Sequence, residues 1–429
     1  MNTPTKASTE NAQKLEAAYA SVSDLYRGKT DDLYAACREM RQTTRVYEGD
    51  FIAKFLGVPT NAGLQTKPTY AVFQYQDVMN VLKDANTFTS GFILEGMGKV
   101  WDGLMILGMD GEAHRKVRAL LQPAFMPENV NKWRPKIDRV VREDFLQPLL
   151  PNKKADLMEM GLHFPVRAMY ALVGFPEDNP DQYNQYATWA LSMLAANQLD
   201  KAKAEEGRRI AAIAVKSLYD ALMEQVKRRR AEGATGDDLI TRLMNAEYEG
   251  HKLDDHEVAT FARSLLPAAG ETTTRTFSAA MTFLLTVPGL IDRVRNDRAL
   301  VSKLIDEAVR FEPSSTFKVR ETSADVQIGD VLIPKGSFVQ CMVAAANRDE
   351  SAFENPDVFD IDRRQKPSFG FGFGPHMCIG QFVAKLELNC AINGILDLFP
   401  NVRLDPEQPA PKIEGAHLRG AKSVHVIWD

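Results

Sequence analysis

The chain has 429 residues, of which 45% are hydrophobic and 25% are charged, and its net charge is −5. This composition is typical of globular proteins and argues against a general nucleic-acid binder, which would carry a basic surface. The polar N-terminus lacks the apolar core of a signal peptide, and no stretch approaches the roughly 20 apolar residues that span a bilayer. We therefore expect a cytoplasmic protein without a membrane anchor.

The hydrophobic pattern predicts many helices and few strands. Residues 1–30 are polar, and we expect a flexible segment there with one short helix at 12–20. Residues 31–429 contain no linker-like tract, charge block or repeat, which favours a single domain. The expected fold class is mainly α (α+β), with small segregated sheets. Helices are expected at 33–40, 76–83, 114–125, 156–174, 183–196, 210–230, 254–288 and 386–399, and strands at 70–73, 326–333, 337–342 and 423–428, with a turn at 334–336.

Two segments stand out in this pattern. Residues 91–111 are rich in glycine and apolar side chains, which predicts an irregular lid. The long helix at 254–288 opens on a capping signal, with Glu257 three residues after Asp254. Midway along it, Pro267 removes a backbone donor and Gly270 weakens the helix. Together they predict a distorted turn, which is either a functional site or a kink tolerated in the core.

Four cysteines occur in the chain, and they are too few and too scattered for a disulfide framework or a zinc or iron–sulfur site. They are Cys37, Cys341, Cys378 and Cys390. Cys378 alone follows a run of glycines and precedes an apolar run, so we expect a tight loop that enters a helix at about Gly380. A helix N-terminus lowers the pKa of a thiol and favours its metal-ligating form. The alternative is a buried structural thiol.

The loop sequence resembles the haem-thiolate loop of the cytochrome P-450 superfamily. It matches every fixed position of Phe-x-x-Gly-x-His-x-Cys-x-Gly in the segment Phe371-Gly372-Phe373-Gly374-Pro375-His376-Met377-Cys378-Ile379-Gly380. The resemblance implies one large haem-containing domain over 31–429, and haem b with the Cys378 thiolate as its iron ligand. It also implies that Phe371, Gly372 and Gly380 lie beside the cofactor. A thiolate ligand favours O–O cleavage over reversible O2 binding.

A second segment, at residues 268–273, resembles the acid–alcohol pair of the same family. By that match Thr272 would hold dioxygen and an ordered water, Glu271 would relay protons, and Ala268 would border the haem. The chain departs from the pattern at Ala269, where the family usually has glycine.

Further residues match positions with known roles in the family. Glu307 and Arg310, completed by Arg363, resemble a structural network that holds the cysteine loop; by themselves they could be an ordinary surface pair. His114, Arg118, Arg320 and His376 fall at propionate-binding positions, although each alone could be a surface residue. Lys385, Arg115 and Lys116 either form a docking face for an acidic ferredoxin or are ordinary solvated charges.

The resemblance implies a monomeric monooxygenase that takes electrons from a separate [2Fe-2S] ferredoxin and its reductase. It would insert one oxygen atom from O2 into a hydrophobic small molecule, by hydroxylation or epoxidation. Lys318 or Arg419 could pair with a substrate carboxylate. The alternatives are a peroxide-driven or non-oxygenating haem-thiolate enzyme, and a non-catalytic haem sensor or carrier. We expect the substrate pocket to be lined by Phe92, Leu94, Met97, Trp101, Leu265, Phe317, Val319 and Leu418.

Overall fold

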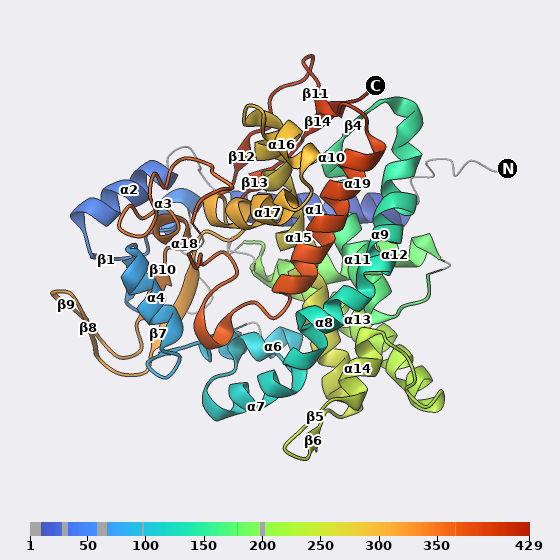
Figure 1. The fold of residues 1–429 in the computed structure, drawn as a ribbon. Coiled ribbons are helices and arrows are strands. Elements are labelled where there is room, and N and C mark those ends of the chain that lie inside the picture. Colours follow the sequence, from blue (N-terminus) through green and yellow to red (C-terminus); the bar gives the residue numbers. More distant parts are fainter. Residues whose placement is uncertain are drawn as a thin grey trace.

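The computed structural model describes residues 10–27, 33–57, 67–96, 98–177, 179–197, 202–364 and 366–429. The fold is mainly helical with small separate sheets, which confirms the expected class. In Figure 1 most helices gather on the right around one long helix, whereas the largest sheet lies on the left with short helices beside it.

The largest sheet has five strands in the order β1-β2-β10-β7-β3, and its pairs are antiparallel except for the parallel pair of β2 and β10. Every residue of the central strand β10 is buried. Helices α2, α4 and α18 pack around this sheet and close two of the three hydrophobic cores. The elements are β1 (Val46–Glu48), β2 (Thr69–Val72), β3 (Phe88–Thr89), β7 (Lys318–Thr322), β10 (Phe338–Cys341), α2 (Leu33–Thr43), α3 (Ala53–Leu56), α4 (Tyr75–Lys83) and α18 (Val343–Ala346).

The largest core surrounds helix α15 (Asp255–Thr286), which begins with the predicted capping box: Asp254 accepts from the Glu257 backbone, and the Glu257 side chain accepts from Asp254. This helix contacts α10 (Leu157–Gly161), α11 (Phe164–Val173), α12 (Pro180–Ser192), α13 (Ala204–Ala231), α14 (Leu239–Asn245), α16 (Leu290–Asn296), α17 (Leu300–Phe311) and α19 (Gln381–Leu398). Buried apolar residues from all of these helices form one continuous cluster.

Two local predictions need correction. The helix expected over 156–174 is broken into α10 and α11, because Pro165 begins a new helix after His163. The strand expected over 326–333 is divided by a tight turn at Gly329, with φ +59°, into a hairpin that pairs β8 (Val326–Ile328) with β9 (Val331–Ile333). The turn expected at 334–336 is found: the Ser337 backbone N–H donates to the Pro334 carbonyl at 3.2 Å, and the chain continues into β10 of the main sheet.

Of residues 1–30, where we expected a flexible segment, the structure describes residues 10–27. Helix α1 (Glu10–Arg27) is longer than the short helix predicted at 12–20 and packs against α12. Its side chains Leu15 and Val22 are 5% and 4% exposed and belong to the largest core. Burial of an apolar face is what holds a helix of this length in place.

The expected lid is more regular than its glycine content suggested. It holds two short helices, α5 (Phe92–Gly96) and α6 (Gly98–Trp101), followed by α7 (Gly111–Leu121). The remaining helices and strands are α8 (Pro127–Val130), α9 (Arg134–Arg139), a π-helix at Val140–Leu146, β4 (Lys154–Asp156), β5 (Glu247–Tyr248), β6 (His251–Lys252), β11 (Arg403–Leu404), β12 (Ile413–Glu414), β13 (Gly420–Ala421) and β14 (His425–Ile427).

Among the described residues, no individual helix combines the length and apolarity required to cross a bilayer. The pair α15 and α16, bent by 104°, meets those criteria only when both helices are taken together.

Candidate active site

Cys378 lies at the end of the glycine-rich loop, just before helix α19 begins at Gln381, as predicted. Its backbone N–H donates to the Phe371 carbonyl at 2.7 Å and closes the loop. All four cysteines lie in described ranges. The other three are at most 1% exposed, whereas Cys378 is exposed. Cys378 is therefore the one cysteine that offers surface to a ligand without disruption of a core.

The position of Cys378 before a helix predicted a lowered thiol pKa. Its surroundings favour the thiolate form less than that. The residue keeps accessible surface, yet protein encloses it, and burial raises the pKa of the Cys378 thiol. A hydrogen bond from the Gly380 backbone and the charges of Lys318 and Arg118 offset this rise only in part. A metal ion deprotonates a coordinating thiol outright. These cations would therefore support a metal-bound thiolate but do not create one.

The glycines of the cysteine loop have different structural roles. Gly372 and Gly374 have φ of +76° and +69°, which favour glycine. A Cβ on Gly374 would lie 2.5 Å from the Leu82 carbonyl oxygen, so this glycine lets the loop pack on the end of α4 rather than on a ligand. A Cβ on Gly380 would meet only the Cys378 sulfur, at 4.0 Å. Gly380 thus keeps the space beside the sulfur open.

The structure brings together the four residues predicted for the propionates. His114 and Arg118 come from α7, Arg320 from β7 and His376 from the loop, and the two imidazole rings lie 4.1 Å apart at 32°. Burial, together with the charges of His114, Arg320 and Arg118, lowers the pKa of His376 to about 3. Burial also lowers the pKa of Arg118 and of Arg320.

This cluster is rich in donors and poor in acceptors. Among the described residues, the Nε2 atoms of His114 and His376 are buried and lack a hydrogen-bond partner. A carboxylate oxygen of Asp110 approaches His376 Nε2, but only to 3.5 Å. The cations Arg118 and Arg320 repel one another here, and with the two imidazole rings they suit carboxylate groups of a ligand. The cluster therefore has the chemistry of an anion site.

Strand alternation changes the expected pocket wall on β7. Phe317 and Val319, both predicted to line the pocket, pack into the core formed with α2 and α18. Lys318 and Arg320 take the other face of the strand. The Cys378 thiol and Lys318 lie close enough for the charge of each to affect the pKa of the other. Burial lowers the pKa of Lys318 to about 8.

A strip of α15 stays accessible in the middle of an otherwise buried helix. Its members have the i, i+3, i+4, i+7 spacing of one helix face: Leu265, Ala268, Ala269 and Thr272. Ala268 is exposed, and the Thr272 hydroxyl donates to its carbonyl at 2.9 Å. Leu265 and Ala269 border the same core as Phe371 of the cysteine loop. The strip and the cysteine loop thus both pack against the largest core.

Glu271 lies on a different face of α15 from Thr272. It is 2% exposed, and its Oε1 atom accepts from the Arg275 guanidinium at 2.8 and 2.5 Å. Its Oε2 atom is buried and lacks a hydrogen-bond partner among the described residues. The predicted acid and alcohol are therefore neighbours in sequence that face different surroundings.

The distorted turn predicted in this helix is not found, because α15 runs as a continuous α-helix through Pro267 and Gly270. A Cβ on Gly270 would lie 2.7 Å from Val166 on α11, so close helix packing accounts for this glycine. Hydroxyl groups also donate to carbonyls four residues earlier, from Thr272, Thr274 and Thr276. Such bonds often bend a helix, yet α15 stays continuous through all three residues.

The Glu307 network forms as expected from the motif. Arg310 donates to both oxygens of Glu307 at 2.7 and 2.8 Å, and Arg363 reaches Glu307 at 3.3 Å. Asn347 extends it: its amide donates to the Arg310 carbonyl at 3.0 Å, and its Oδ1 accepts from the Phe369 backbone at 2.8 Å. Sequence reasoning missed Asn347, which no motif marks.

The lid residues and Leu418, which were predicted to line the pocket, differ in exposure and in the residues that they contact. Leu94 is 38% exposed, and the Phe92 ring lies 5.0 Å from that of Phe338. Trp101 is 6% exposed and donates to the Met193 carbonyl, so it supports the lid rather than lining a cavity. Leu418 is 9% exposed and lies in the largest core. Met97 falls outside the described residues.

The expected basic docking face is largely neutralised by carboxylates. Lys385 pairs with Asp306 at 2.7 Å, and Arg115 and Lys116 both pair with Glu112.

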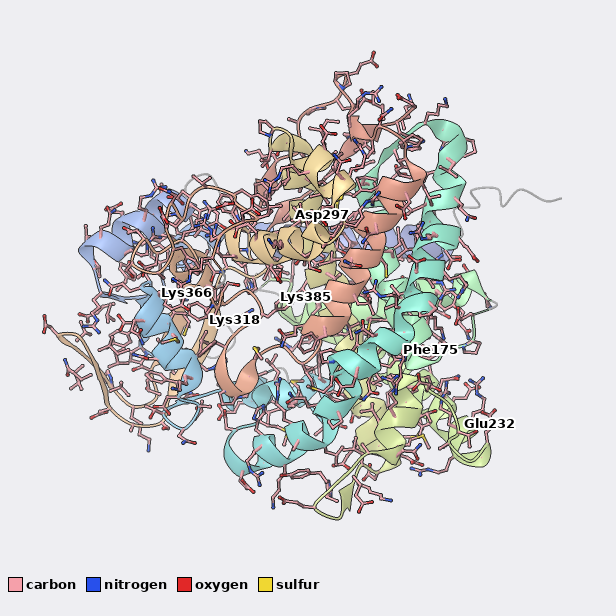
Figure 2. All side chains as sticks on the ribbon, viewed as in Figure 1. Phe175, Glu232, Asp297, Lys318, Lys366 and Lys385 are labelled. Atoms are coloured by element: carbon pink, nitrogen blue, oxygen red, sulfur yellow. The ribbon has the colours of Figure 1, made fainter. Side chains whose placement is uncertain are left out.

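A pocket of about 430 Å³ is lined in part by the cysteine loop. Its lining includes Arg364, Lys366, Phe371, Met377 and Lys385; two of these, Lys366 and Lys385, are labelled in Figure 2.

Comparison with known proteins identifies the family. The model of the cytochrome P-450 family matches residues 52–426. The chain is 30% identical to cyclomarin C epoxidase of Salinispora arenicola, over 81% of this chain and 87% of the relative. It is also 30% identical to erythromycin C-12 hydroxylase of Saccharopolyspora erythraea, over 78% and 83%. The ligand-free structure of cytochrome P-450 TbtJ1 superposes with a TM-score of 0.79 at 30% identity, covering 93% of this chain and 99% of that one.

The residues present fit the haem that this family carries with a cysteine thiolate ligand. One accessible cysteine stands beside a cluster of two arginines and two histidines, and the buried Nε2 atoms of both histidines lack a hydrogen-bond partner in the described part of the chain. A soft sulfur ligand suits iron, and the donor cluster suits two propionates. The chain belongs to the cytochrome P-450 family and is a haem-thiolate monooxygenase.

Proposed function

We propose that this enzyme inserts one oxygen atom from O2 into a C–H or C=C bond of an apolar small molecule. The observation that carries the proposal is the accessible strip on α15, where the Thr272 hydroxyl stands among Leu265, Ala268 and Ala269. An apolar surface with one hydroxyl suits an apolar substrate and one proton-transfer step. The hydroxylase and epoxidase among the relatives support both outcomes.

We assign the cofactor contacts to residues of this chain. Cys378 would supply the thiolate ligand, and His114, Arg118, Arg320 and His376 would hold the propionates, with Phe371, Gly372 and Gly380 beside the ring. The haem, when bound, supplies O2 activation. The protein would supply the protons. Thr272 would hold a proton at the accessible strip, and Glu271, on a different face of α15, would deliver protons.

The Cys378 assignment is tested by comparing Cys378→Ala with Cys390→Ala. Cys390 lies on α19 and is 1% exposed, so it is the matched control for a cysteine near the same loop. After reconstitution with haem and reduction under carbon monoxide, only Cys378→Ala should lose the red-shifted Soret band of thiolate ligation. Loss of that band in Cys390→Ala alone would contradict the assignment.

Substrate class is tested by titrating a library of apolar compounds and recording the shift of the Soret band as the spin state changes. Terpenoids, aromatic hydrocarbons, steroids and fatty acids belong in that library. The compounds that bind are then tested for turnover, once with ferredoxin and reductase and once with hydrogen peroxide. This comparison separates a monooxygenase that uses O2 from a peroxide-driven enzyme. Product formed only with peroxide would contradict the proposal.

We further propose that a separate [2Fe-2S] ferredoxin and its reductase supply the electrons. Met377 is 36% exposed beside Cys378, in the pocket that carries Arg364 and Lys366. Exposed cations beside the cysteine loop suit an acidic electron donor. A cytoplasmic setting is part of the same proposal, because the four cysteines are unpaired.

A further inference from the structure

The lid is fastened to helix α15 where the lid helix α6 ends. The Arg263 guanidinium of α15 donates through Nη2 to the carbonyls of Trp101 and Asp102, the latter at 2.5 Å. The last carbonyls of a helix lack partners within it, and a cation that donates to them also complements the negative end of the helix. Arg263 is 4% exposed, so these bonds form away from water.

Three residues earlier on α15, Thr260 holds the next part of the lid. Its hydroxyl oxygen accepts from the Leu104 backbone N–H at 3.0 Å and donates to the His256 carbonyl at 2.8 Å. Gly103, just before Leu104, has φ +82°, and a Cβ there would lie 2.4 Å from the Thr260 methyl carbon. Glycine is the residue that permits both this backbone conformation and this close approach. The end of α6 therefore lies directly on α15.

Helix α5, in the first half of the lid, is held less firmly. None of its residues is buried, and Leu94 is 38% exposed. Leu94 lies close to Gly98 and Gly108, where a Cβ would come within 3.3 and 2.7 Å of its side chain, and both glycines belong to the lid itself. The base of the lid is closed separately, because both carboxylate oxygens of Asp110 accept from the Ser90 backbone N–H, at 3.0 and 2.8 Å. Helix α5 thus lies between two fixed points.

We propose that Arg263 and Thr260 form a clasp that fixes the α6 end of the lid on α15, so that the lid opens at its α5 end. Both are positioning residues: they set how far the substrate pocket opens without touching the substrate. The clasp lies about three turns before Thr272 on the same helix. The inference rests on the proposed function in one respect, namely that the lid covers the substrate pocket.

Hydrogen exchange of the haem-loaded protein tests the contact itself. Thr260→Val keeps the shape of a buried side chain but removes the acceptor of the Leu104 N–H. Exchange at residues 101–104 should become about two- to tenfold faster, as expected for the loss of one hydrogen bond. Thr260→Ser keeps the hydroxyl and should restore the exchange rate of wild type. Unchanged exchange at residues 101–104 in Thr260→Val would overturn the proposal.

Two comparisons complete the exchange experiment. Thr282→Val is the matched control, because the Thr282 hydroxyl donates within α15, to the Ser278 carbonyl at 2.7 Å, and Thr282 is buried as well. It should leave exchange at residues 101–104 as in wild type, and an equal effect of both valine variants would point to the helix and overturn the clasp. In wild type, residues 92–96 should exchange faster than residues 101–104. The reverse order would contradict opening at α5.

The effect on the pocket is tested with two nitrogen ligands of haem iron, imidazole and the bulkier 4-phenylimidazole. Stopped-flow recording of the Soret band gives their association rates. Thr260→Val and Arg263→Met should speed association of 4-phenylimidazole about two- to tenfold and leave imidazole unchanged, because the small ligand needs less opening of the lid. Thr260→Ser and Thr282→Val should match wild type for both ligands. A change for neither ligand, or an equal change for both, would overturn the proposal.

The design separates the possible failures. If Arg263→Met does not load haem, Thr260→Val and Thr260→Ser decide the outcome, since they differ in the hydroxyl that the proposal invokes. Exchange and ligand association are measured without turnover. A protein that shows the expected lid effects but forms no product with O2 would therefore refute the proposed function and leave the clasp standing. Normal turnover with unchanged exchange in Thr260→Val would refute the clasp alone.

Discussion

Asn347 links Arg310 to the start of the cysteine loop. Its side chain accepts from the backbone N–H of Phe369 at 2.8 Å and donates to the carbonyl of Arg310 at 3.0 Å. Asn347 is fully buried, and Arg310 itself is held by Glu307. The ion pair on α17 is thus connected to the start of the loop through one amide. No residue spacing in the sequence signals this connection.

Asn347→Ala should therefore loosen the loop as well as the fold. It leaves a buried backbone N–H and a buried carbonyl without partners, which costs about 1–3 kcal/mol for each unsatisfied group. Thermal unfolding should show the loss of stability, and transfer of haem to an apo-globin acceptor should be faster. Asn393→Ala serves as the control: the Asn393 amide donates within its own helix to Asn389, and its oxygen accepts a long bond of 3.4 Å from Arg298, away from the cysteine loop. Equal haem loss in both variants would contradict the linking role.

The alcohol on α15 can be tested with a neighbour of the same chemistry. Thr272 and Thr276 each donate a hydroxyl hydrogen bond to the carbonyl four residues earlier, at 2.9 and 3.0 Å. Only Thr272 belongs to the accessible strip, because Thr276 is 6% exposed. Thr272→Ala should keep consuming electrons but release peroxide in place of product, whereas Thr276→Ala should stay coupled. Uncoupling in both variants would point to helix distortion and away from proton delivery.

The sequence predicted the broad fold and the residues of the site because those follow from local signals. The capping box of α15 and the start of α19 rest on residue type and spacing, whereas the four donor residues around the loop were expected only from the resemblance to the family. What it missed depends on tertiary packing. Gly270 lies where α11 crosses α15 and Gly374 where the loop meets α4, so neither glycine marks a distorted or ligand-facing backbone.

The same limit applies to side-chain direction. The aromatic and aliphatic character of Phe317 and Val319 suggested a pocket wall, yet the alternation of β7 places them in a core and turns Lys318 toward the cysteine loop. The hydrogen bond from Asn11 of α1 to Asp181 of α12, at 2.7 Å, joins residues 170 positions apart. A single sequence carries no signal for such a contact.

His417 on the C-terminal loop, a half-buried histidine, predicts a pH dependence of stability. Burial, aided by the charge of Lys318, lowers the pKa of His417 to about 3. The unfolded chain takes up a proton near pH 6.5, while the folded protein resists protonation until about pH 3. Between these values the unfolded state binds more protons, so stability falls as pH drops below 6.5, by at most about 1.4 kcal/mol per pH unit from this residue.

His417→Gln should flatten this part of the stability profile. The glutamine keeps a polar group near the Ser315 hydroxyl, which lies 3.3 Å from the histidine Nε2, but it does not titrate. Denaturant unfolding of wild type and variant at a series of pH values from 7 downward gives the comparison. Parallel profiles would show that His417 does not titrate differently in the folded and unfolded states.

The cations of the pocket beside the cysteine loop predict where an electron donor docks. Among the pocket's cations, Lys385 is neutralised by Asp306, whereas no carboxylate partner is found in the described residues for Arg364 and Lys366. Charge reversal by Arg364→Glu and Lys366→Glu should slow reduction by ferredoxin, most strongly at low salt, because steering depends on unscreened charge. Stopped-flow reduction at several salt concentrations measures the effect.

Two controls locate the effect at this pocket. Reduction by dithionite, which needs no docking, should be equally fast in the reversed variants and in wild type. Lys116→Glu reverses a charge already paired with Glu112 on α7 and should leave ferredoxin-driven reduction nearly unchanged. Because Met377 is exposed in the same pocket and next to Cys378, a donor held there would lie beside the cysteine loop. If Lys116→Glu slowed reduction more than the pocket variants did, the donor would dock on the α7 face instead.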